Sequence, residues 1–319
     1  TRALSLVTTG ENVVRDVMYN GNPAPEAGAI VCRVAQSFIR FGSFQIHAMN
    51  GDKATLEQLV DHTIQQHFPE HSMSDDASLI AWLNQIATET AVMIAHWMRV
   101  GFVHGVMNTD NMSIHGLTID YGPYGWIEDY NPNWTPNTTD ARTGRYRFGQ
   151  QAQIGAWNLA RLLESISPLM EEPERLYACL ETYYTAYDDQ NNAFWADKLG
   201  LDDFQDEDEA LVTQLTSNLQ LVETDMTIFF RLLSTMEKPD VDHLQFAFYD
   251  SENIPTDEWN TWLSSWWERV GGKPNHAVMK KANPKYVLRN WMAQLAIDAA
   301  EKEDYSVALE LLELMKTPY

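Results

Sequence analysis

The sequence predicts an α+β fold that begins with β-rich sequence and continues as a mainly helical chain. Short apolar stretches at 3–8 and 29–35 have the length and composition of strands. After Gly51, apolar residues recur at helical spacing. With 45% hydrophobic residues and 11 tryptophans, the 319-residue chain can bury a substantial core. We therefore expect a β lobe over residues 1–48 and a helical lobe over residues 49–319.

The β lobe is expected to include a third strand-like segment at 41–47, where apolar and polar residues partly alternate. The longest predicted helix, 76–100, has N-cap candidates at 74–76 and Gly101 just past its end. Trp262, Trp266 and Trp267 lie at helical spacing, which indicates core packing more than a ligand stack. The periodicity predicts helices at about 54–68, 76–100, 151–166, 173–188, 208–235, 256–270, 284–298 and 305–315.

Residues 101–150 are rich in loop-forming sequence and contain two acidic motifs. Asp110 and Asn111 are followed ten positions after Asp110 by Asp120, which begins an Asp-Tyr-Gly triplet. The residues between them, 112–119, have the right length for a tight hairpin that returns Asp120 beside Asp110. Each motif is similar to part of the protein-kinase site, where one Asp receives a hydroxyl proton and an Asn and a second Asp hold magnesium.

A simpler interpretation of the same motifs is that both are solvated turns, because Asn, Asp and Gly favour turns for backbone reasons alone. The predicted buried helix 76–100 favours a functional interpretation. It would deliver the chain directly into the Asp-bearing loop, which is the arrangement of a kinase C-lobe. We therefore predict a site that handles phosphoryl groups.

Basic residues are scarce, with 22 Lys and Arg against 45 Asp and Glu. Arg33 and Arg40 lie within apolar sequence, where an unpaired guanidinium would be prohibitively costly to bury. They would either grip phosphate oxygens or lie at an edge strand, facing water or an acidic side chain. A second set, Arg142, Arg145 and Arg147, follows the acidic motifs. That set would act as an activation segment, contact a substrate, or form a polar loop.

The net charge of −23 argues against binding nucleic acid or an anionic membrane, both of which depend on clustered Lys and Arg. No apolar run approaches the length of a membrane span, and no signal peptide leads the chain. Cys32 and Cys179 are far apart, so we expect reduced thiols in a cytoplasmic protein.

Several segments together resemble the selenoprotein O family of protein-kinase-like enzymes, and the likeness extends over essentially the whole chain. The acidic motifs are the most specific part of the resemblance. The matching segments are 1–9, 33–35, 40–44, 104–112, 116–125, 144–146, 157–159 and 283–291.

This resemblance implies a kinase-like fold and transfer of AMP from ATP to Ser, Thr or Tyr hydroxyls of proteins. It implies that Arg33 and Arg40 bind the phosphates and that Asp110 receives the hydroxyl proton. It also implies that Asn111 and Asp120 hold Mg²⁺, or Mn²⁺ in its place, so that Asp120 contacts the nucleotide through the metal. The expected partners are ATP and protein substrates, with no nucleic acid and no membrane.

The resemblance further implies that a glycine-rich nucleotide loop, with a Lys and a Glu, would precede Thr1, and that a redox-active residue would follow Tyr319. We therefore expect this chain to be a fragment that binds ATP weakly and catalyses little transfer. Two alternatives stay open at this point. One is a conventional kinase that transfers the γ-phosphoryl group, and the other is a non-enzymatic pseudokinase or scaffold.

Overall fold

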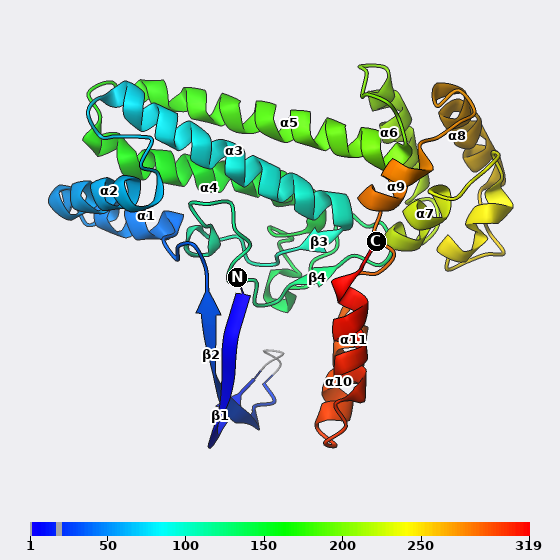
Figure 1. The fold of residues 1–319 in the computed structure, drawn as a ribbon, viewed down its shortest axis with the longest axis horizontal. Helices are drawn as coiled ribbons and strands as arrows, with labels where there is room; N and C mark the ends of the chain where they lie inside the picture. Colours follow the sequence, from blue (N-terminus) through cyan, green and yellow to red (C-terminus); the bar gives the residue numbers. More distant parts are fainter. Residues whose placement is uncertain (1, 17–20) are drawn as a thin grey trace. The chain divides into compact units, whose positions relative to one another are not determined.

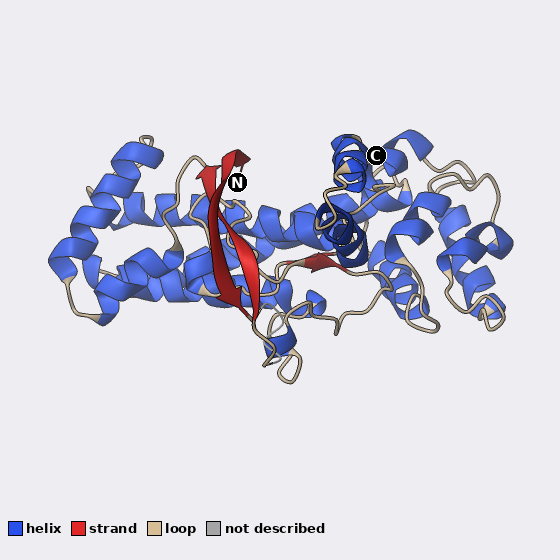
Figure 2. Ribbon diagram, turned by 90° about the horizontal axis from the view of Figure 1, so that it is seen from below, coloured by secondary structure: helices blue, strands red, loops and turns tan. Residues whose placement is uncertain are grey.

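The computed structural model describes residues 2–16 and 21–319, and it confirms an α+β chain that is mainly helical (Figures 1 and 2). Two compact units can be distinguished, and each is described by itself. Unit 1 comprises the chain up to Ile94 together with His104–Tyr124 and Thr135–Tyr187. Unit 2 comprises Ala95–Val103, Gly125–Trp134 and Asp188–Tyr319. These units are defined by proximity, whereas the division after residue 48 into two kinase-like lobes stays a prediction.

Unit 1 begins with a two-stranded antiparallel ribbon (Figure 2). Strands β1 (Arg2–Arg15) and β2 (Ala24–Val34) pair with Ala3 opposite Arg33. Both predicted strands exist, but both are longer than the apolar pattern indicated. The additional residues are mostly polar or small, and they extend the ladder through backbone pairing, which hydrophobicity does not reveal.

Residues 41–47, predicted as a strand, instead belong to helix α1 (Phe41–Met49). Phe41 and Phe44 are fully buried, and their spacing of three places them on one helical face. The Ser43 hydroxyl accepts a hydrogen bond from the Arg40 backbone N–H at 3.2 Å, which supports the helix start. Helix α2 (Lys53–His67) follows, with the Asp52 carboxylate accepting a hydrogen bond from Thr55 N.

Within unit 1, parts of the long helices α3 (Asp76–Val100) and α5 (Tyr177–Leu199) lie beside α4 (Gln151–Ile166) (Figure 1). Gly155 permits this close approach, because a Cβ there would lie 2.3 Å from the Ile94 side chain and 2.4 Å from the Tyr183 hydroxyl. The predicted boundaries of α3 are confirmed. The Asp75 carboxylate accepts from Ser78 N at its start, and Gly101 has a φ of +74° after its end.

The region 101–150 is loop-rich, as predicted. Its regular elements are short. They are β3 (Phe102–Val103), β4 (Gly125–Trp126) and the 3₁₀ turns Thr109–Asn111, Thr138–Asp140 and Phe148–Gln150. Strands β3 and β4, for example, pair with each other over only two residues each.

Unit 2 is helical, and its core contains Trp259, Trp262 and Trp266, all fully buried. Of the tryptophans predicted to pack in the core, Trp262 and Trp266 are therefore confirmed, and Trp267 is half-buried. The predicted helix 208–235 is wrong because it is two helices. Asp225 pairs through its backbone N–H with Ala247 O at 2.7 Å and caps the second helix through its side chain. The helices are α6 (Asp208–Asn218), α7 (Met226–Leu233), α8 (Thr256–Arg269), α9 (His276–Ala282), α10 (Asn290–Ala300) and α11 (Ser306–Lys316).

Other helix boundaries also differ from the prediction, most of all in α5 and α10. Helix α5 extends to Leu199 and is preceded by a 3₁₀ turn at Pro173–Leu176, and α10 begins at Asn290 instead of 284. Helix α9 was not predicted, because its seven residues are too few for periodicity to be visible. Among the helices of the described residues, none has both the length and the apolar character needed to cross a membrane.

Candidate functional site

The segment after Asn111 returns along itself as a hairpin, as its length predicted. Met112 and Thr118 form an antiparallel bridge, and Ser113 forms another with Arg40. The Phe41 N–H also donates to Met112 O at 3.0 Å. The hairpin is therefore bound through its backbone to the residues that begin α1, and all of these residues belong to unit 1.

Asp120 receives both predicted arginines. Arg33 Nη1 donates to Asp120 Oδ1 at 2.9 Å, and Arg40 Nε donates to Oδ2 at 2.8 Å. Arg40 Nη2 is a second donor to Oδ2. Both arginines are thus paired with an acidic side chain, which is one of the environments expected for them. The carboxylate in question is itself one of the predicted site residues.

The electrostatic environment of Asp120 favours its charged form. Partial burial tends to raise the pKa of this carboxyl, but the hydrogen bonds and positive charges of Arg33 and Arg40 outweigh burial and lower it. The backbone of Asp120 has a φ of +53°, in the left-handed region that Asp and Asn tolerate better than most side chains. A charged carboxylate is therefore held at a sharp turn of the chain.

The chain before Asp120 is fixed by His104, whose side chain is fully buried. A ring nitrogen, Nε2, lies 2.8 Å from the Ile119 carbonyl oxygen, and the His104 backbone N–H donates to Gln151 Oε1 at 3.0 Å. Burial lowers the pKa of His104. Because a carbonyl oxygen can only accept, Nε2 donates in this hydrogen bond. His104 thus positions the backbone next to Asp120.

Asp110 lies against the first turn of α1. A Cβ added to Gly42 would lie 2.0 Å from Asp110 Oδ1, so only a residue without a side chain permits this contact. Asp110 is exposed, and no described residue forms an ion pair or side-chain hydrogen bond with it. Arg40 and Gly42, two positions apart, therefore contact Asp120 and Asp110 respectively, which brings the two acidic residues to the same end of α1.

Asn111 has one amide atom occupied and one available. Its Nδ2 donates to Val106 O at 2.9 Å, which turns Oδ1 the other way, and no described residue donates to that oxygen. Amide and carboxylate oxygens are the hard ligands that Mg²⁺ prefers, so Asn111 and Asp120 have the donor types for such an ion, with both Asp120 oxygens paired with arginines in the structure. The described part of the chain has no cluster of three or more His, Cys, Asp or Glu that could hold a metal. A metal here would take its remaining ligands from phosphates and water.

A second loop is attached to the one that carries Asp110. Asn137 Nδ2 donates to Gly105 O at 3.0 Å, and the Tyr146 hydroxyl donates to Asn108 Oδ1. Between these two attachments, the buried Asp140 carboxylate accepts from the backbone N–H groups of Arg145 and Tyr146, at 2.9 and 2.7 Å. The sequence reasoning placed three arginines in this loop but did not identify Asp140 as the residue that shapes it.

Helix α4 contributes two polar residues that sequence reasoning also missed. Gln151 accepts from His104 N, and Asn158 Nδ2 donates to Met107 O at 2.8 Å. Both side chains are fully buried. They lie seven positions apart, which is two helical turns, on the apolar face of an amphipathic helix. Polar residues at that spacing on a buried face were the signal that could have identified them.

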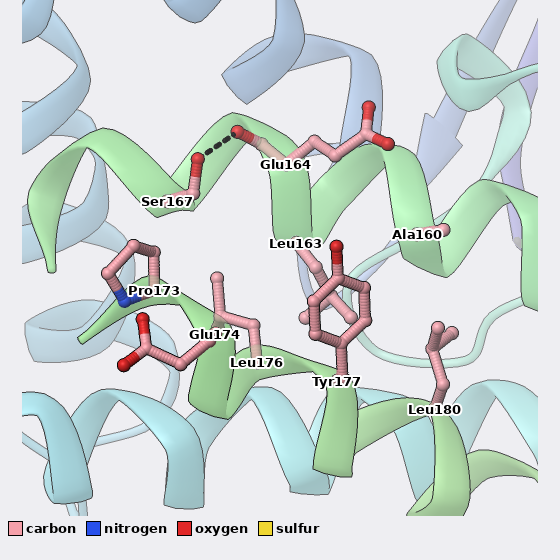
Figure 3. Close-up of a pocket in the computed structure, with 9 residues that line it drawn as sticks. All are labelled: Ala160, Leu163, Glu164, Ser167, Pro173, Glu174, Leu176, Tyr177 and Leu180. Atoms are coloured by element: carbon pink, nitrogen blue, oxygen red, sulfur yellow. Dashed lines mark hydrogen bonds between the residues drawn. The ribbon is translucent and has the colours of Figure 1, made fainter.

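Unit 1 also has a hollow of about 360 Å³ between α4 and the start of α5, lined by Leu163, Tyr177 and Leu180 among others (Figure 3). Its charged lining residues are Glu164 and Glu174, and none of the described residues that line it is basic. Phosphate oxygens would meet repulsion there. The groups suited to a nucleotide are instead those around Asp120.

Comparison with known proteins shows which family the chain belongs to. A family model described as "Protein adenylyltransferase SelO" matches residues 1–316. Proteins described as "Protein nucleotidyltransferase YdiU" are 49% identical in Flavobacterium johnsoniae and 50% identical in Aromatoleum aromaticum, each over the whole chain. The chain spans 64% and 63% of the length of these two relatives.

Proposed function

The chain belongs to the SelO family of protein adenylyltransferases, and we propose that it carries the phosphate-binding and metal-binding part of an enzyme that transfers AMP from ATP to protein hydroxyl groups. The observation that carries the proposal is the convergence of Arg33 and Arg40 on Asp120, next to the exposed Asp110. This arrangement supplies paired cations, a carboxylate for a metal and a free carboxylate at one helix end.

In this proposal Arg33 and Arg40 bind the β- and γ-phosphates of ATP, so that the α-phosphorus faces the incoming hydroxyl. Planar guanidinium groups donate two parallel hydrogen bonds to phosphate, which orients as well as attracts it. In the structure Asp120 holds both arginines. When the triphosphate takes over the arginines, the Asp120 carboxylate becomes available to a cation.

The chemistry proposed is an in-line displacement. A Ser, Thr or Tyr oxygen forms a bond to the α-phosphorus, the bond from that phosphorus to the α–β bridging oxygen breaks, and pyrophosphate leaves with the bond electrons. Asp110 accepts the hydroxyl proton. Arg33 and Arg40 stabilise the negative charge that develops on pyrophosphate. Mg²⁺, held by Asn111 and Asp120, would supply further neutralisation of the phosphate oxygens.

The proposed fold assignment is protein-kinase-like, with β1 and β2 as part of a β lobe and the helices as the larger lobe. It is supported by the order of the functional elements along the chain. Strand β2, which carries Arg33, comes first, then a long helix, α3, then the Asp110 loop and the Asp120 turn. This is the order in which kinases present their phosphate Lys, catalytic Asp and metal-binding Asp.

The test is transfer of label from ATP to protein. This chain and the relative from Aromatoleum aromaticum are incubated separately with ATP labelled at the α- or the γ-phosphate, Mg²⁺ and a mixture of acceptor proteins. Label from the α-position on protein supports AMP transfer. Label from the γ-position alone would replace it with phosphoryl transfer. If ATP binds neither protein, as measured by calorimetry, the proposal is overturned in favour of a non-enzymatic scaffold.

A further inference from the structure

The loop 140–147, here called the arginine loop, follows the motifs of Asp110 and Asp120 in unit 1. It carries three arginines. Arg142, Arg145 and Arg147 have no ion pair with a carboxylate anywhere in the part of the chain that the structure describes. In a chain with 45 acidic and 22 basic residues, three neighbouring unneutralised arginines are unexpected. Arg142 and Arg145 are exposed, and Arg147 is half-buried.

The arginine loop has a defined shape even though its side chains are exposed. The Asp140 carboxylate accepts hydrogen bonds from the Thr143 hydroxyl and from the backbone N–H groups of Arg145 and Tyr146. The backbone carbonyl oxygen of Asp140 accepts from Gly144 N at 2.7 Å. All of these donors belong to the loop itself. Asp140 therefore organises the loop without neutralising any of its guanidinium groups.

Arg145 is held in place by stacking. Its guanidinium carbon lies 4.4 Å from the centre of the Trp157 ring and 5.6 Å from that of Tyr146. Arg161 approaches the Trp157 ring at 5.4 Å but is paired with Glu164. Trp157 is 40% exposed, so the ring that holds Arg145 lies at the surface. Stacking on an aromatic face orients a guanidinium and leaves its in-plane N–H groups free to bind an anion.

The position of the loop connects this surface to the proposed reaction. Its Tyr146 side chain is bonded to Asn108, two residues before Asp110, and the preceding Asn137 is bonded to Gly105. A ligand on the arginine loop would therefore be attached through short contacts to the loop that carries the proposed proton acceptor.

We propose that the arginine loop and Trp157 form a docking surface for acidic side chains that flank the accepting hydroxyl in a protein substrate. This inference rests on the proposed function and names the class of substrate for it. A single exposed charge pair contributes little. Several carboxylates on one peptide are therefore needed for measurable affinity. Neighbouring exposed arginines beside an aromatic ring can contact several peptide side chains at once, which suits a peptide better than a lone ion. The acidic remainder of the chain repels such a peptide elsewhere, which fixes where it binds.

The test is direct binding without ATP. A fluorescein-labelled peptide with one central Tyr flanked by Glu is compared, by fluorescence anisotropy at low ionic strength, with the same peptide carrying Gln in place of Glu. We expect the Glu peptide to bind about tenfold more tightly to this chain, and its affinity to fall as salt is added.

The variant Arg142→Glu with Arg145→Glu should weaken binding of the Glu peptide about tenfold or more. The matched control is Lys53→Glu with Arg175→Glu, which changes the net charge equally at exposed positions elsewhere in unit 1 and should leave binding nearly unchanged. Trp157→Ala should weaken binding by removing the face on which Arg145 is held. Circular dichroism establishes that each variant is folded.

Equal loss in the control pair, or equal affinity for the Glu and Gln peptides, would overturn the inference. Displacement of the Glu peptide by inorganic phosphate, where chloride of equal ionic strength has no effect, would also overturn it and assign the loop to a phosphate ligand. Because the assay involves neither nucleotide nor transfer, its failure is distinct from failure of AMP transfer.

Discussion

Arg40 and Asp120 lie 80 positions apart in the sequence, yet Nε and Nη2 of Arg40 both donate to Oδ2 of Asp120. Arg33 occupies the other carboxylate oxygen. If the arginines bind the triphosphate and Asp120 binds the metal, as proposed, the two binding events should be coupled, because each competes for one side of the same ion pair. This coupling separates Asp120 experimentally from residues that bind nucleotide directly.

We predict that Asp120→Asn weakens ATP binding in the presence of Mg²⁺ by about tenfold or more, because a charged ligand for the metal is lost. Without metal, the same variant should bind ATP as well as or better than the unchanged chain, since both arginines are less strongly held. Asn suits the left-handed backbone at this position, so strain is not introduced. Titration calorimetry in Mg²⁺ and in EDTA measures both. Asp61→Asn, an exposed change in α2, is the control. An equal loss in EDTA would contradict the prediction.

For Asp110→Asn we expect whatever AMP transfer this chain supports to fall by about 10²- to 10⁴-fold, the usual contribution of a positioned general base, and so to become undetectable if the starting rate is low. ATP affinity should stay nearly the same, because this carboxylate has no described bond to Arg33 or Arg40. Transfer of α-label and calorimetric titration are measured on the same preparation. A variant that lost ATP binding and transfer in parallel would show that Asp110 acts in binding.

Asp140→Ala should lower the free energy of unfolding by about 1–3 kcal/mol, since it leaves the N–H groups of Arg145 and Tyr146 without their acceptor. Asp140→Asn retains one acceptor oxygen and should lose less. Urea denaturation followed by circular dichroism gives both values. Identical stability of the Ala variant and the unchanged chain would mean that the loop finds other acceptors.

A further prediction concerns Lys198, which is buried in unit 2. Its Nζ donates to Asn283 Oδ1 at 2.8 Å and to Arg99 O at 3.1 Å. Burial, assisted by the charge of Arg99, sets the pKa of Lys198 well below its usual value. Below that pKa both the folded and the unfolded chain carry the proton, and the burial penalty is fully present.

As the pH rises from the folded pKa of Lys198 towards the unfolded value of about 10.4, the unfolded chain binds more protons than the folded one. The free energy of unfolding should therefore rise with pH in this window. Lys198→Met removes that contribution, so the difference in the free energy of unfolding between the two proteins should change with pH below the unfolded value of about 10.4. Urea denaturation across the range checks this. Parallel pH profiles would contradict a lowered pKa.

Only one of the two cysteines should react in the folded protein. Cys32 is exposed, whereas Cys179 is fully buried, and burial raises the pKa of its thiol to about 11. Because the thiolate is the reactive form, a thiol reagent at about pH 8 should modify Cys32 rapidly and Cys179 only after unfolding. Cys32→Ser should then show no fast reaction. Rapid modification of that variant would place Cys179 at the surface.

Much of the helical architecture was predictable from periodicity, because long amphipathic helices such as α3 repeat their apolar residues many times. The boundary errors arose where tertiary contacts decide. The break between α6 and α7 depends on Asp225, whose backbone pairs with Ala247, and a window of local sequence contains no trace of that partner. Helix α1 was predicted as a strand because nine residues with two buried phenylalanines suit either period.

The candidate site was predictable in its components but not in its connections. The hairpin 112–119 followed from its length, and the need of Arg33 and Arg40 for partners followed from their apolar surroundings. That their common partner is Asp120 could not be read from local sequence, because the pairing joins distant segments. Gly42 and Asp140 were missed for the same reason, since each acts through a contact that exists only in the folded chain.

Gly42 affects the distance between the Asp110 carboxylate and the arginines of the proposed reaction. A methyl group at this position would overlap the Asp110 carboxylate, so any side chain there must either rotate that carboxylate or push the first turn of α1 outward. Arg40 immediately precedes the same turn, and either movement would alter the spacing between the proton acceptor and the cations. The absence of a side chain at Gly42 thus sets the distance between the Asp110 carboxylate and the start of α1, where Arg40 lies.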